Sequence, residues 1–154
     1  MKSIFVLGSV ALALLTASIA SAQQALQLDN AHVGALQALE DFYRKQKKWS
    51  DLVTVLARHA EVEQEPGPRV DILLQLADTY ETQIGDTAQS TFAYQRALDT
   101  DERCIDAINA LERLYRRTQA WDRLVDVLAK KSQVVDDTEQ ALRLKLQVGE
   151  LWED

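Results

Sequence analysis

The stretch Leu39–Lys45, with the sequence LEDFYRK, returns 72 residues later as Leu111–Arg117, with the sequence LERLYRR. The register continues on both sides, because 16 of 51 positions are identical between residues 32–82 and residues 104–154. A repeat of this length indicates units that bury their apolar faces against their neighbours. The internal repeat therefore decides the fold class before any single element does.

Apolar residues within the unit recur at three- and four-residue spacing, which is the period of a helix. Val33, Leu36 and Leu39 begin one such stripe. The chain of 154 residues contains only 5 Gly and 2 Pro, which leaves little material for the turns of a β-sandwich. We therefore expect an all-α chain of about seven helices. They would pair as hairpins over residues 31–65, 68–100 and 103–136, with a half hairpin over residues 138–154.

The hairpins resemble tetratricopeptide (TPR) repeats, whose helices carry the patterns W-x2-L-G-x2-Y and then A-x3-F. The first pattern is found over residues 36–43, 73–80, 108–115 and 145–152, and the second is matched best over residues 90–97. Glu40 and Glu112 stand where the family has Gly, and Leu stands at the small position of two second helices. The resemblance implies a right-handed α-solenoid of antiparallel hairpins in a divergent, bacterial-type array. The departures predict looser packing between the helices.

The first 22 residues have the pattern of a secretory signal peptide. Lys2 precedes an uncharged apolar run, and Ala20-Ser21-Ala22 is a small-x-small cleavage site. Cleavage after Ala22 would leave residues 23–154 as an exported TPR-like domain, periplasmic or secreted. The alternative is an uncleaved membrane anchor, although polar residues dilute a run that needs about 20 apolar residues to span a bilayer.

The composition argues against several classes of function. A net charge of −7 counts against nucleic acid as the main partner. One Cys and two His cannot build a zinc site with three or four N/S ligands. The sequence has no nucleophile elbow, zinc-protease helix or phosphate loop. We expect no catalytic residue, cofactor, metal or small-molecule substrate, and interpret the chain as a scaffold or adaptor of the cell envelope with a protein or peptide partner.

The resemblance also implies a binding surface, because the first helices of TPR hairpins line a concave groove. Asp71, Gln75 and Asp78 of the middle hairpin would point into it, between basic ends. Such a groove suits a peptide of mixed charge, or a C-terminal carboxylate held by Arg. The alternative for the basic residues at helix ends is that they stabilise the C-terminal dipole. The candidate partner-binding residues are Gln37, Asp41, Arg44, Asn109, Arg113 and Arg116.

Several other residues are expected to be structural. Trp49 and Trp121 begin the second helices of the first and third hairpins, where we expect them to be buried over the turn. His59 aligns with Lys131, which predicts a solvent-exposed helix position. Cys104 is predicted to lie at a helix start.

The C-terminal end leaves alternatives open. The given sequence ends at Asp154, two residues after Trp152, whereas the first copy of the repeat continues into a fourth helix. An array normally ends in a polar capping helix, so we expect either a fragment of a longer array or self-association through the C-terminal helix. Two other interpretations are an accessory or regulatory domain of a larger enzyme and a self-assembling structural oligomer.

Overall fold

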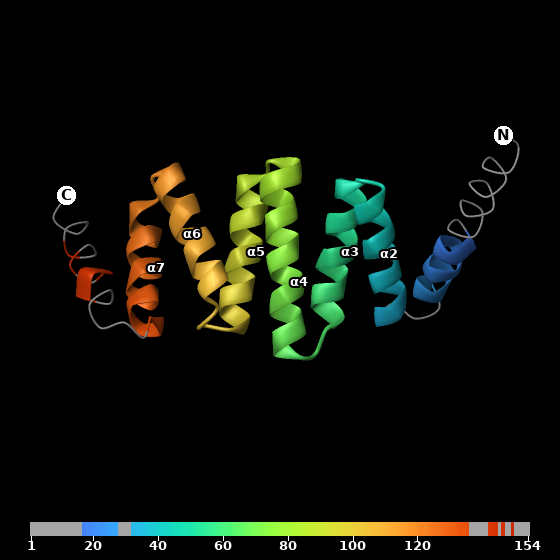
Figure 1. Cartoon of the computed structure of the whole chain (residues 1–154), viewed down its shortest axis with the longest axis horizontal. Coiled ribbons are helices and arrows are strands. Elements are labelled where there is room, and N and C mark those ends of the chain that lie inside the picture. Colours follow the sequence, from blue (N-terminus) through green and yellow to red (C-terminus); the bar gives the residue numbers. More distant parts are fainter. Residues whose placement is uncertain (1–16, 28–31, 136–141, 145, 147–148, 150–154) are drawn as a thin grey trace, which may run out of the picture. The chain divides into compact units, whose positions relative to one another are not determined.

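The computed structural model describes residues 17–27, 32–135, 142–144, 146 and 149. The described part contains helices and no strand, which confirms the all-α fold and is consistent with a TPR-like α-solenoid. A helix over residues 17–27 precedes α2. The expected seventh helix and Trp152 lie mostly outside the described residues. The other elements are α2 (Val33–Lys45), α3 (Trp49–Val62), α4 (Pro66–Asp78), η1 (Thr79–Ile84), α5 (Thr87–Thr100), α6 (Ile105–Thr118) and α7 (Trp121–Val134) (Figure 1).

The chain divides into two compact units, one ending at Glu63 and the other beginning at Gln64. In the first unit, α2 packs against α3. In the second, α4 and its continuation η1 pack against α5, then α5 packs against α6 and α6 against α7 (Figure 1). Within each unit, successive helices therefore bury their apolar stripes against one another.

The core of the first unit extends to the helix over residues 17–27. Leu36, Leu52 and Leu56 of the α2–α3 hairpin are fully buried. Ala22 and Leu26 are also buried, and they belong to the apolar cluster that includes Leu36. The predicted cleavage site after Ala22 thus lies within this helix. Among the residues that the structure describes, no helix has the length and apolar character needed to cross a membrane.

Proline and glycine set the ends of the α4–η1 segment. Pro66 is the first residue of α4, where its missing N–H would have had no helical partner. Gly85 ends η1 with a φ of 81°, a left-handed conformation that costs glycine little. Asp86 then caps α5, because its Oδ1 accepts a hydrogen bond of 3.0 Å from the Gln89 amide.

The end of the third expected helix is a π-helix rather than an α-helix. The hydroxyl of Thr79 donates to the Gln75 carbonyl at 2.7 Å, and that of Thr82 donates to the Asp78 carbonyl at 2.8 Å. Such bonds compete with the backbone amides for the same carbonyls. A π turn holds more residues than an α turn. This fits the spacing of 35 residues between Tyr80 and Tyr115, one longer than a TPR repeat.

Two expectations about single residues are wrong. His59 is buried rather than solvated, with 3% of its surface exposed, because its Nδ1 lies 2.6 Å from Glu40 Oε1 on the facing helix. Trp121 is 49% exposed, so it does not belong to the core of its hairpin. Trp49, its counterpart in the first hairpin, is half-buried.

Candidate functional site

A pocket of about 540 Å³ in the second unit is lined by three helices. The first helices of two successive hairpins, α4 and α6, contribute most of the lining, and the intervening helix α5 contributes Tyr94. Tyr94 and Ala110 are buried, and Leu74 is half-buried. The pocket therefore combines apolar surface with exposed polar groups. Its lining residues are Leu74, Asp78, Tyr94, Asp106, Asn109, Ala110 and Arg113.

Helical periodicity brings these residues to one side of each helix. Leu74 and Asp78 are four residues apart on α4. Asp106, Asn109 and Arg113 follow at three- and four-residue spacing on α6. Residues at these spacings are neighbours on a helix surface. A single face of α4 and a single face of α6 therefore supply the polar lining.

Arg113 is held at the pocket by a carboxylate from the π-helix η1. Its guanidinium donates to both oxygens of Glu81, from Nη1 to Oε1 and from Nη2 to Oε2, the latter at 2.9 Å. Only 7% of the Glu81 side chain is exposed, against 58% for Arg113. A bidentate pair of this kind is stronger and more directional than a single ion pair. Hydrogen bonding to Glu81 also raises the pKa of Arg113.

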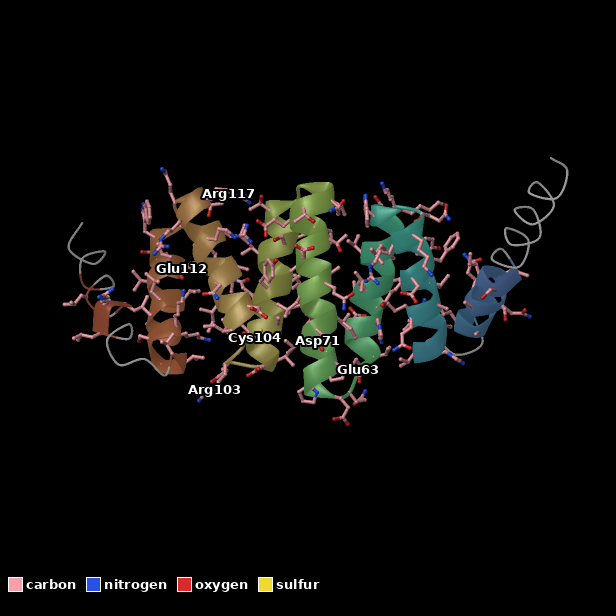
Figure 2. The ribbon with its side chains drawn as sticks, viewed as in Figure 1. Glu63, Asp71, Arg103, Cys104, Glu112 and Arg117 are labelled. Atoms are coloured by element: carbon pink, nitrogen blue, oxygen red, sulfur yellow. The ribbon has the colours of Figure 1, made fainter. Side chains whose placement is uncertain are left out.

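Two further groups converge on Glu81. The Arg117 guanidinium, near the C-terminal end of α6 (Figure 2), lies 3.7 Å from Glu81 Oε1 and donates to the Thr87 hydroxyl at 3.2 Å. Burial, together with the carboxylates of Glu81 and Asp78, raises the pKa of Tyr94 to about 12. The Tyr94 phenol is therefore protonated at neutral pH, within electrostatic reach of the Glu81 carboxylate. Glu81 thus links η1, α5 and α6.

The structure separates the three candidate residues of α6. Asn109 and Arg113 line the pocket together with Asp78 of the middle hairpin. Arg116 instead pairs along its own helix, with Nη1 2.6 Å from Glu112 Oε1. Asp71 lines a different pocket, at the N-terminal end of α4.

The three candidates in the first unit lie exposed on α2. Arg44 Nη1 is 3.6 Å from Asp41 Oδ1, one turn away, so the structure brings these two together in a surface ion pair. Gln37 is exposed one turn before Asp41. These residues belong to the first unit, whereas the pocket on α4 and α6 belongs to the second.

Sequence reasoning missed several lining residues and the Glu81 network. Tyr94 carried a signal, because it stands in the best match to the second-helix pattern. Glu81 also carried one, because the repeat places Glu153 at the same position. Nothing in the local sequence predicted the pairing of Glu81 with Arg113, which lies 32 residues away on another helix. No feature of the sequence singled out Leu74, Asp106 or Ala110 as a pocket-lining residue.

A second concave region of about 550 Å³ in the same unit is lined by α5, α6 and α7. There the side-chain amide of Gln95 on α5 donates to the Tyr115 hydroxyl at 2.6 Å. The charged lining residues are Asp99 of α5 and Arg123, Asp126 and Lys130 of α7. Within the described ranges, no group of His, Cys, Asp or Glu side chains is arranged to hold a metal ion. Cys104 is buried at the N-terminal end of α6 as a free thiol (Figure 2).

The sequence model of one family, described as Tetratricopeptide repeat, matches residues 35–70 and 107–142. The two matches begin 72 residues apart, so they fall on the same part of the internal repeat. One covers most of the α2–α3 hairpin and the other most of the α6–α7 hairpin. No curated protein matches the chain.

Proposed function

Because the chain belongs to the tetratricopeptide repeat family, whose repeats mediate protein–protein interactions, we propose that it is a non-catalytic scaffold that binds a peptide segment of a partner protein in the pocket between α4 and α6. The observation that carries this proposal is the composition of that pocket, which is lined by the first helices of successive hairpins. The apolar surfaces of Leu74 and Ala110 suit a peptide side chain, and the amide of Asn109 suits hydrogen bonding to a peptide backbone.

A peptide library displayed on phage tests this function. The full chain, carrying a C-terminal tag, would be used to select peptides, whose affinities are then measured by calorimetry. Asn109→Trp places a large side chain in the pocket from an exposed position, so it should abolish binding. The matched control is Gln133→Trp, which changes an exposed position on α7 outside the pocket. Selection of no peptide, or equal binding by both variants, would contradict the proposal.

We also propose that the chain is exported and acts in the cell envelope. The support is the sequence of residues 1–22, with Lys2, the apolar run and the Ala20-Ser21-Ala22 site. Mass spectrometry of the tagged chain recovered from periplasmic extract should give an N-terminus at Gln23. Ala22→Tyr, with a bulky side chain at the cleavage site, should retain the first 22 residues. Recovery of the intact chain from cytosol or membrane in the unmodified case would contradict the proposal.

A further inference from the structure

The charges that line the pocket are unequally matched. Arg113 is the cationic lining residue, and both of its hydrogen bonds to Glu81 use a carboxylate that is outside the lining. Asp78 and Asp106 are the anionic lining residues, and both are exposed. Within the described ranges, neither carboxylate forms a salt bridge. With Arg113 matched by Glu81, the pocket keeps two negative charges from these aspartates.

Arg113 is a poor candidate for holding a ligand carboxylate. Turning its guanidinium toward a ligand would remove the bidentate partner from Glu81. Only 7% of the Glu81 side chain is exposed. A buried carboxylate that loses its partner is strongly destabilised. Arg117 would remain 3.7 Å from Glu81 Oε1, but this single, longer ion pair does not replace the two hydrogen bonds of Arg113. The geometry thus argues against the carboxylate-binding role expected for Arg113 from the sequence.

The two aspartates lie on different helices, and apolar residues of the same helices line the pocket with them. Asp78 belongs to α4 with Leu74, and Asp106 belongs to α6 with Ala110. A long basic side chain matches this arrangement, because its aliphatic stem packs on apolar surface while its charged end stays with polar groups. A carboxylate side chain would instead meet two like charges.

We propose, resting on the peptide-binding function above, that this pocket takes a lysine or arginine side chain of the bound peptide. Its charged end lies between Asp78 and Asp106, and its stem lies against Leu74 and Ala110. Arg113 and Glu81 keep their pair when the peptide binds. The partner segment is therefore basic, in keeping with the chain's net charge of −7.

The peptides selected in the phage experiment supply the probe. Those whose binding is lost in Asn109→Trp should share a lysine or arginine at one position. Changing that residue to norleucine should weaken binding by about tenfold. The double variant Asp78→Asn/Asp106→Asn should weaken the parent peptide by a similar factor and should bind the norleucine peptide as tightly as the unmodified chain does. This agreement between the two changes identifies the aspartates as the partners of the basic side chain.

A matched variant controls for the change in net charge. Glu102→Gln/Asp122→Asn removes two exposed carboxylates outside the pocket and should leave the affinity for the basic peptide within about twofold at moderate salt. Circular dichroism of each variant checks that the helices are intact. Selected peptides that carry acidic residues instead, or that lose affinity equally in both double variants, would overturn the inference. In those cases, continued loss of binding in Asn109→Trp would leave the proposed peptide-binding function standing.

Discussion

The first and third hairpins carry the same buried carboxylate and pair it with different bases. In the first, Glu40 of α2 has its Oε1 2.6 Å from His59 Nδ1 on α3. In the third, Glu112 of α6 accepts a hydrogen bond of 2.7 Å from Lys131 Nζ on α7. Each residue of the first pair lies 72 positions before its counterpart. Both glutamates occupy the position where the TPR pattern has Gly.

This difference explains how the chain departs from the family pattern without losing the hairpin. A carboxylate that replaces Gly between two helices is buried, and a buried carboxylate needs a donor from the facing helix. His and Lys both supply an N–H group at that point, so either satisfies it. The third hairpin adds Arg116, whose Nη1 lies 2.6 Å from the other oxygen of Glu112. Looser packing was predicted from Glu40 and Glu112 in place of Gly. At both positions the structure has a buried acid–base pair between the two helices.

Removal of the base that pairs with the buried glutamate should lower the free energy of unfolding more than any other change considered. The loss should be larger in the first hairpin. His59→Ala removes a buried ring and the hydrogen bond that it forms with Glu40, so the free energy of unfolding should fall by about 3 kcal/mol. Lys131→Ala leaves Glu112 paired with Arg116, so the loss should be about 1–2 kcal/mol. Urea denaturation followed by circular dichroism measures both.

Replacing both members of the first pair separates the cost of the unpaired carboxylate from that of the lost ring. Glu40→Leu with His59→Leu should recover about 1 kcal/mol or more relative to His59→Ala, because no buried charge remains. Equal losses for His59→Ala and Lys131→Ala would show that Arg116 does not support Glu112, and would contradict the comparison.

Substitutions at the helix starts of the two copies should change the free energy of unfolding by a smaller amount. His32 caps α2, with its Nδ1 accepting a hydrogen bond of 3.1 Å from the Ala35 amide. Cys104 occupies the same position before α6 and forms no side-chain cap bond. Cys104→Ser should therefore raise the free energy of unfolding by about 1 kcal/mol, and His32→Ala should lower it by about as much. Thermal and urea denaturation test this, and an unchanged or lower stability of Cys104→Ser would refute it.

The hairpin turns of the two copies have similar backbone conformations, so glycine substitutions in them should change the stability alike. Lys47 and Gln119 adopt positive φ angles of 55° and 57° at equivalent positions, although neither is glycine. Lys47→Gly and Gln119→Gly should each raise the free energy of unfolding by about 0.5–1 kcal/mol, because glycine adopts this conformation without steric cost. Ala38→Gly, at an exposed position in the middle of α2, is the control and should instead lower it. A loss of stability in either turn variant would be the contrary result.

The buried Glu40 should make the stability of the first hairpin depend modestly on pH. Burial raises the pKa of Glu40 above its ordinary value of 4.5, and the neighbouring His59 only partly offsets this. The folded-state pKa is therefore above the unfolded one, so the contribution of Glu40 is fully present below pH 4.5 and is lost as pH rises through the raised pKa.

Glu40→Gln isolates this dependence because glutamine does not ionise. The variant should gain stability relative to the unmodified chain as pH rises above 4.5, in urea denaturation at a series of pH values. An NMR titration of the Glu40 side-chain carbon gives the folded-state pKa directly. A stability difference that does not change with pH would mean that the carboxyl titrates alike in the folded and unfolded chain.

Local patterns predicted much of the fold and part of the candidate site. The helical stripes could be predicted because they depend on residues within a few positions of one another. Asn109 and Arg113 were identified through the TPR resemblance and do line the pocket. The same reasoning predicted a solvated His59, because an alignment with Lys131 says that both positions hold a base and not what that base contacts.

The sequence by itself determined that this protein is an all-α array of TPR-like hairpins, because helical periodicity and an internal repeat are recorded in neighbouring residues. Only the tertiary structure decided which polar side chains are free. It paired Glu40 with His59 across 19 residues and Arg113 with Glu81 across 32. The first pairing depends on how α2 and α3 pack, and the second on where η1 lies relative to α6; local sequence spacing specifies neither distance.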